Sequence, residues 1–142
     1  MEAVLGASLE GKTGPVTTGS LAEAEFVLLY FSAHWCPPCR AFTPRLALFY
    51  NEVNATRKQV EVVFISFDRD EAGFREYYGE MPWLTVPFGS KAVRESLAKR
   101  FGVSGIPMLA LLKRDGSLAL NSCKGDVESR GPAAIERWRA AL

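Results

Sequence analysis

The chain lacks long hydrophobic runs, blocks of one charge, internal repeats and low-complexity segments. Its 142 residues include 17 basic and 16 acidic side chains, and basic residues cluster no further than in pairs. Nucleic acids and anionic membrane surfaces attract proteins through basic patches, so we expect neither as a partner. No stretch approaches the roughly 20 apolar residues that a transmembrane helix needs. We therefore expect no membrane span.

A secretory signal is also missing from the start of the chain. Residues 1–14 contain no basic start followed by an apolar stretch. The expected location is therefore the cytoplasm, with the nucleus as the alternative. In a reducing compartment, a close pair of cysteines is more often catalytic or metal-binding than structural.

Cysteine and histidine are scarce, yet two of the three cysteines lie together in Trp35-Cys36-Pro37-Pro38-Cys39. This motif follows an apolar, strand-like run and precedes a helical pattern. The first sulfur is therefore expected at a helix N-terminus, where free N–H groups and the helix dipole favour an anion. A thiolate attacks disulfides, and a second thiol nearby can displace whatever the first has bound. The motif predicts a reversible, exposed dithiol couple.

Two other roles for Cys36 and Cys39 are open. A static disulfide between them would close a very small loop, which restrains the unfolded chain little. Zinc or an iron–sulfur cluster needs further ligands, and only Cys123 and the single histidine, His34, remain to supply them. A cluster shared between two chains would remove that shortage. We expect no metal and no organic cofactor, and we interpret Cys123 as a structural or incidental thiol.

The length and composition indicate one globular domain over residues 1–142. The chain is 48% hydrophobic and 23% charged, and it is long enough to bury a core without disulfide bonds. Residues 1–20 are expected to form an N-terminal extension, in which residues 16–18 are the only candidate strand. We expect a monomer.

A continuous apolar run, residues 26–31, and a second buried-type segment, residues 60–67, are typical of strands that are covered on both faces. Apolar residues between them recur with helical spacing, at Phe42, Leu46, Phe49 and Val53. A strand, helix and strand in this order predict a parallel pair with a right-handed crossover.

The second half of the chain predicts two short helices, over residues 70–78 and between Ser90 and Gly102. Residues 81–88 contain two prolines and are expected to form an extended connection.

A hairpin and a last helix are expected after these. Asp115-Gly116 separates two apolar runs, residues 109–112 and 118–120, which predicts antiparallel strands and therefore a mixed sheet. Pro132 can open a helix whose apolar residues recur at Ile135, Trp138 and Leu142.

A cysteine pair between the first parallel strand and its helix, followed by a hairpin and a closing helix, is the order of the thioredoxin fold. From about Leu21 onward the chain resembles the thioredoxin superfamily, and within it the tryparedoxin and nucleoredoxin branch. The segments that carry the resemblance are Tyr30 to Arg40 with Phe42-Thr43-Pro44, Pro82-Trp83-Leu84 with Val86-Pro87-Phe88, and Gly105-Ile106-Pro107. The implied architecture is an α/β thioredoxin fold with a central mixed sheet flanked by helices on both faces.

The resemblance implies a protein-disulfide reductase. Cys36 would attack a substrate disulfide and Cys39 would resolve the mixed disulfide that forms. The expected partners are a disulfide-containing protein, such as a peroxiredoxin-type peroxidase, and an external dithiol that reduces the internal disulfide. The alternative is a redox-gated binding module in which turnover is incidental.

Residues next to the cysteines are expected to shape the site. Trp35 either forms one wall of the site or is a core aromatic, and Pro37 and Pro38 form the first helical turn. Arg40 either raises the local positive potential or is only solvated. We assign His34 no catalytic role and expect it to be solvated.

More distant residues complete the expected site. The resemblance implies that the Ile106–Pro107 bond is cis and that the backbone of Ile106 pairs with an extended substrate segment. Trp83 either belongs to the same rim or packs beneath it. Tyr30 occupies the position where many thioredoxins carry a buried carboxylate, and tyrosine is a poor proton acceptor at neutral pH. The group that accepts the Cys39 proton is therefore not identified by the sequence.

Overall fold

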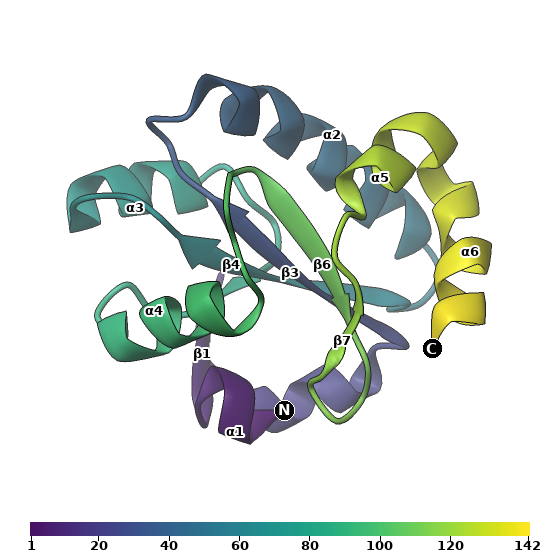
Figure 1. Ribbon diagram of the computed structural model, residues 1–142, viewed down its shortest axis with the longest axis horizontal. Helices are drawn as coiled ribbons and strands as arrows, with labels where there is room; N and C mark the ends of the chain where they lie inside the picture. Colours follow the sequence, from purple (N-terminus) through teal and green to yellow (C-terminus); the bar gives the residue numbers. More distant parts are fainter.

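The computed structural model describes residues 1–142 as one seven-stranded mixed sheet with helices on both faces (Figure 1). The strand order is β2-β1-β5-β4-β3-β6-β7. The strands are β1 (Ser8–Gly11), β2 (Gly14–Thr17), β3 (Phe26–Ser32), β4 (Val60–Ser66), β5 (Leu84–Thr85), β6 (Met108–Leu112) and β7 (Leu118–Leu120). The α-helices are α1 (Glu2–Leu5), α2 (Pro37–Val53), α3 (Glu71–Tyr78), α4 (Lys91–Arg100), α5 (Lys124–Arg130) and α6 (Ala134–Ala141). Two 3₁₀ helices cover Thr18–Glu23 and Gly131–Ala133.

Strand β3 lies at the centre of the sheet, as its continuous apolar sequence predicts. It pairs with β4 in parallel and with β6 in antiparallel orientation. Alternate side chains of a strand point to opposite faces, and β3 places its even-numbered apolar residues in one core cluster and its odd-numbered ones in the other. Both faces of β3 are therefore buried.

The two faces of the sheet carry different helices. Helices α2, α3, α5 and α6 bury residues in one core cluster, and α1, α4 and the first 3₁₀ helix bury residues in the other. Figure 1 shows α2, α5 and α6 on one side of the sheet and α1 and α4 on the opposite side. The expected arrangement, a mixed sheet flanked on both faces, is confirmed.

Three segments that are distant in the sequence meet at one edge of the sheet. Strands β3 and β4 are parallel and in register at their ends, where Ser32 pairs with Ser66. Strand β6 runs the other way and begins with Met108 paired to Phe31. The residues after β3, after β4 and before β6 therefore lie together, at the carboxyl edge where α/β sheets place their sites.

Several short elements of the fold have little or no signal in the sequence. The expected strand over residues 16–18 is β2, which lies slightly earlier and pairs with an unpredicted partner, β1. Strand β5 has two residues between prolines, too few for a periodic signal, yet it joins β1 to β4. Helix α5 buries Val127 alone among its residues, so it too lacks apolar periodicity.

The Asp70 cap and the glycine turns are confirmed, and Ser90 precedes α4 as expected, although its side chain forms no capping hydrogen bond. The side chain of Asp70 caps α3 by accepting a hydrogen bond from the Gly73 amide at 2.8 Å. Gly102 lies just after the end of α4 and has a φ of 62°. Gly116 lies in the turn of the β6–β7 hairpin and has a φ of 89°. The prediction for Leu142 is wrong: this residue follows α6 and is 49% exposed instead of covering the sheet.

Candidate active site

Cys36 is the N-cap residue of α2, directly after the loop that leaves β3. Its extended backbone, with φ of −98° and ψ of 109°, lets its amide donate to the Ala33 carbonyl at 3.2 Å. Pro37 and Pro38 are exposed and carry no N–H group, so the amide of Cys39 is the only N–H among the first three helical residues. The dipole of a 17-residue helix, more than free amides, therefore acts on the Cys36 sulfur.

The two sulfurs differ in depth. Cys39 is fully buried, whereas Cys36 retains 5% of its surface. Phe67 and Ile106 pack against the small cluster that the cysteines form with Ala33. The prediction of an openly exposed Cys36 is therefore wrong, because these side chains cover most of it; the order of the two cysteines, with Cys36 outermost, agrees with the prediction.

The backbone of Ile106 faces the outer cysteine. The Cys36 thiol donates to the Ile106 carbonyl oxygen, with sulfur and oxygen 3.8 Å apart. The Ile106–Pro107 peptide bond is cis, as the resemblance implied. From Pro107 a groove of about 400 Å³ extends between residues 101–105 and 121–124, where Asn121 and Lys124 give it polar walls. Pro107 lines this groove, whereas Cys36 does not.

Trp35 lies on the surface next to Cys36 and is 47% exposed. Its indole Nε1 donates to the Phe67 carbonyl at 3.0 Å, and the Arg69 guanidinium lies 5.0 Å from the ring centroid. These contacts fix the ring at the surface beside Cys36. Of the two roles left open for Trp35, the wall of the site is the one that the structure supports. Arg40 is exposed on α2 and forms no ion pair.

Trp83 does not lie on the rim. It is 1% exposed, and its ring packs edge-on against Tyr30 at 6.0 Å and Tyr50 at 5.7 Å between centroids. The site-shaping role is therefore wrong, and packing in the core, the alternative, is correct. The physical reason is that Trp83 directly precedes β5 and its ring belongs to the larger core cluster.

Asp68 is a site residue that the sequence analysis missed. The residue is 8% exposed, and its carboxylate accepts hydrogen bonds from the His34 amide at 2.8 Å and the Ser66 hydroxyl at 2.7 Å. These bonds tie the loop before Cys36 to the end of β4. An acidic residue just after a buried parallel strand was the available signal. His34 is only partly solvated, because its ring lies against Tyr77 with centroids 5.5 Å apart.

Burial perturbs the ionisation of the inner groups. Burial, and then the hydrogen bond with Cys36, raise the pKa of the Cys39 thiol to about 11. Burial also raises the pKa of Tyr30 far above its usual range, so this side chain stays protonated. Its hydroxyl lies 2.8 Å from Thr43 Oγ1 and contacts the Cys39 carbonyl at 3.4 Å. The sequence argument that Tyr30 is a poor proton acceptor is supported.

Cys123 lies away from the other two cysteines. It is fully buried in the core at the start of α5, and its amide donates to the Leu109 carbonyl at 2.9 Å. Burial raises the pKa of its thiol to about 12. Its placement fits the structural role expected for it.

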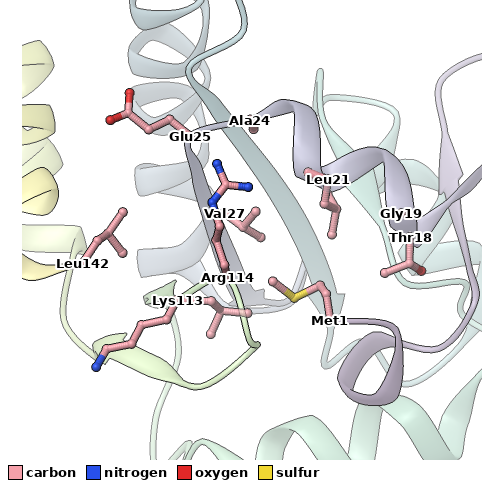
Figure 2. Close-up of a pocket in the computed structure, with 12 residues that line it drawn as sticks. Met1, Thr18, Gly19, Leu21, Ala24, Glu25, Val27, Lys113, Arg114 and Leu142 are labelled. Carbon is pink, nitrogen blue, oxygen red and sulfur yellow. The ribbon is translucent and has the colours of Figure 1, made fainter.

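A separate cavity of about 390 Å³ lies at the opposite edge of the sheet, near the start of β3 (Figure 2). Leu21, Val27 and Leu112 line it, with Arg114 beside them. It contains no cysteine, serine or histidine, and its one carboxylate, Glu25, is held by Arg139. This cavity is not the candidate active site.

No three His, Cys, Asp or Glu side chains are grouped where they could hold a metal ion. No helix has both the length and the apolar character needed to cross a membrane.

The amino-acid sequence of the chain is similar to those of known proteins. A thioredoxin-like family model matches residues 24–118. Tryparedoxin from Trypanosoma brucei brucei is 50% identical over 108 residues, which cover 76% of this chain and 74% of that protein. Probable nucleoredoxin 1 from Arabidopsis thaliana is 46% identical over 124 residues, covering 87% of this chain and 21% of that protein. This chain thus spans about three quarters of the tryparedoxin but only about a fifth of the nucleoredoxin.

Solved structures of tryparedoxins also superpose closely on this chain. The solved structure of tryparedoxin from Trypanosoma brucei superposes with a TM-score of 0.87 at 41% identity, covering 96% of this chain and 95% of that one. Tryparedoxin I from Crithidia fasciculata gives a TM-score of 0.85 at 36% identity, covering 92% of each chain. The sheet order, the Cys36–Cys39 motif and these likenesses make the chain a thioredoxin-fold oxidoreductase of the thioredoxin-like family, in its tryparedoxin and nucleoredoxin branch.

Proposed function

We propose that this protein reduces protein disulfides through a cycle in which Cys36 and Cys39 alternate between dithiol and disulfide. The observation that carries the proposal is the placement of Cys36 at the N-terminus of α2, with the buried Cys39 one helical turn below it. A helix N-terminus favours the thiolate form of a cysteine, and the thiolate is the attacking species.

The cycle has two exchange steps. The Cys36 thiolate attacks one sulfur of a substrate disulfide, which breaks that bond, forms a mixed disulfide and releases the first substrate thiol. Cys39 then attacks the Cys36 sulfur, forms the internal disulfide and releases the second thiol. An external dithiol reduces the internal disulfide and returns both protons and electrons. No cofactor is required for this cycle.

The substrate we propose is a protein segment in extended form. The Ile106 backbone beside Cys36 can accept or donate hydrogen bonds to such a segment, and the exposed ring of Trp35 can cover it from the other side. A peroxiredoxin-type peroxidase is one protein of this class. One related structure is titled as tryparedoxin II complexed with glutathionylspermidine, which supports a small thiol as the reductant. We propose that the protein works as a monomer in the cytoplasm.

A redox-gated binding module is a second candidate function. The low exposure of Cys36 favours it, because a sulfur covered by Phe67 and Ile106 exchanges slowly unless the substrate displaces them. In that case a partner would be held in one thiol state and released in the other.

Reduction of insulin by dithiothreitol tests both candidates. The wild-type chain is expected to accelerate the reaction, and Cys36→Ser is expected to abolish the acceleration. Cys123→Ala is the matched control, since it removes a thiol outside the site and should leave the rate unchanged. If the wild-type chain shows no acceleration and Cys36→Ser still captures the same partners, the binding module replaces the reductase.

A further inference from the structure

The cavity near the start of β3 is lined by residues that the proposed exchange cycle does not use (Figure 2). Val27 and Leu112 line it from the sheet, where they are direct partners in the pairing of β3 with β6. Leu21, from the first 3₁₀ helix, lines it as well and belongs to the same core cluster. Its volume of about 390 Å³ lies within the range of small-molecule sites, which is about 300–1,000 Å³. The cavity is therefore large enough for a small organic ligand.

The polar side chains in the cavity wall are largely engaged elsewhere. The Thr18 hydroxyl donates to the Gly6 carbonyl. The Glu25 carboxylate accepts hydrogen bonds from Arg139 at 2.7 and 3.0 Å, which lower the pKa of Glu25, and the charge of Arg114 lowers it further. An extended peptide needs partners for its N–H and C=O groups, whereas an aliphatic chain needs none. The interior therefore favours an aliphatic chain over a peptide.

Two cations flank this apolar interior. Lys113 and Arg114 are exposed, line the cavity and form no ion pair. The carboxylate of Asp115, the next residue, accepts hydrogen bonds from the amide and the hydroxyl of Ser117. In Figure 2 the Lys113 side chain extends away from the lining residues, whereas the guanidinium of Arg114 lies among them. Arg114 is therefore placed to bind an anionic group, and a guanidinium matches a carboxylate with two parallel hydrogen bonds.

We propose that this cavity binds a free aliphatic carboxylate of medium chain length, with its chain against Leu21 and Val27 and its carboxylate on the Arg114 guanidinium. The apolar walls and the unpaired arginine match the two parts of such a molecule. Removal of the aliphatic chain from water drives binding, and the charged hydrogen bonds fix the orientation. The site is separate from the redox cysteines, so this inference goes beyond the proposed function and does not depend on it.

Ala24 offers a way to fill the cavity without changing the core. It lines the cavity and is 5% exposed, yet it belongs to none of the core clusters. A longer side chain at this position is expected to occupy the cavity and leave the core residues in place. Ala24→Leu should therefore shorten the aliphatic chain that fits.

Calorimetric titration of the whole chain with decanoate, below its micelle concentration, tests the proposal. We expect saturable binding at one site with a Kd of about 100 μM or lower. Decyltrimethylammonium has the same aliphatic chain with a cationic head, and it should not bind because Arg114 repels it. Amide NMR shifts should place the bound decanoate at Leu21 and Val27 and not at Cys36.

Substitutions separate the head group from the chain. Arg114→Gln should weaken decanoate binding by about tenfold or more, because it removes charged hydrogen bonds to the carboxylate. Lys113→Gln removes only a screened surface charge and should weaken binding by about threefold or less. Arg100→Gln is the matched control, since it removes an exposed arginine of α4 outside the cavity and should leave the Kd unchanged. Ala24→Leu should weaken the binding of decanoate and spare that of hexanoate.

The possible results lead to different conclusions. Absence of saturable decanoate binding, or equal binding by the wild-type chain and Arg114→Gln, overturns the proposal. Binding to phosphatidylglycerol vesicles without binding of free decanoate also overturns it and assigns this face to a lipid surface. Self-association that Arg114→Gln abolishes, without decanoate binding, overturns it in favour of a second copy of the chain.

Two features keep the test decisive. If Ala24→Leu does not fold, Arg114→Gln still separates the outcomes, because Arg114 is exposed and its side chain holds no other element in place. None of the measurements uses disulfide exchange. A failure of the proposed reductase would therefore leave the binding site untouched, and a failure of decanoate binding would leave the reductase untouched.

Discussion

The sulfur of Cys36 and the carbonyl oxygen of Ile106 lie 3.8 Å apart, although 70 residues separate them in the chain. Parallel pairing of β3 with β4 and antiparallel pairing of β3 with β6 bring the two segments to one edge of the sheet. A backbone carbonyl next to a nucleophile cannot be removed by substitution. Its contribution must be tested through the residues around it.

Cys39→Ser should convert the exchange cycle into a covalent trap. Without the second thiol, the mixed disulfide on Cys36 has no internal nucleophile to resolve it. Incubation with an oxidised protein substrate is expected to give a cross-linked species on a non-reducing gel that dithiothreitol releases. The double variant Cys36→Ser, Cys39→Ser should give none; a cross-link that persists there would place the reactive thiol elsewhere.

Trp35→Ala should weaken substrate binding and leave stability almost unchanged. The ring is 47% exposed and contributes surface to the rim more than to the core. Loss of an aromatic anchor at a binding surface costs about 2 kcal/mol or more, which is roughly a thirtyfold increase in KM. Steady-state insulin reduction measures KM and kcat separately. A large fall in the melting temperature with an unchanged KM would contradict the assignment.

Trp83→Ala should behave in the opposite way. Its ring is buried against Tyr30 and Tyr50, and truncating a buried tryptophan costs about 3–5 kcal/mol of stability. Urea unfolding should show this loss, while the remaining folded protein keeps its KM. If Trp83→Ala keeps full stability and raises KM, the residue belongs to the rim after all.

The sequence could predict the parts of the fold that carry their own periodic or steric signal. Strands β3 and β4 are buried on both faces and are therefore mostly apolar, with Glu61 the one charged residue in them, and Asp115-Gly116 carries the turn chemistry of the β6–β7 hairpin. Elements β5 and α5 have no such signal. Their conformation depends on neighbours that are distant in the sequence, as tertiary contacts override local preference.

The residues of the candidate site likewise divide into those that the sequence could predict and those that it could not. Cys36, Cys39 and the Ile106–Pro107 segment were predictable because motif spacing or resemblance pointed to them. The hydrogen bonds that join the buried hydroxyls of Ser32, Tyr77 and Thr43 were not, since these residues belong to three separate elements and are ordinary buried residues in any linear pattern. The degree to which Phe67 and Ile106 cover Cys36 was also beyond the sequence, because it depends on loop packing.

The reduced protein should lose stability as the pH rises above about 9, in part through Cys123. Burial raises the pKa of this thiol from its ordinary value of 9.0 to about 12. Above pH 9 the unfolded chain therefore releases a proton that the folded chain still holds, so the free energy of unfolding falls as pH rises towards 12. Below pH 9 the contribution is fully present. Between pH 8 and pH 10 it amounts to about 1 kcal/mol for this one group.

Cys123→Ala isolates that contribution. Cys39 and the buried tyrosines change stability in the same direction with pH, but they are present in both proteins, so they cancel in the comparison. Urea unfolding under reducing conditions at pH 8 and pH 10 should show a smaller loss in the variant, by about 1 kcal/mol. An equal loss in both proteins would mean that the Cys123 thiol ionises in the folded state as easily as in the unfolded chain. In that case the site at the start of α5 would have to admit water, contrary to its complete burial.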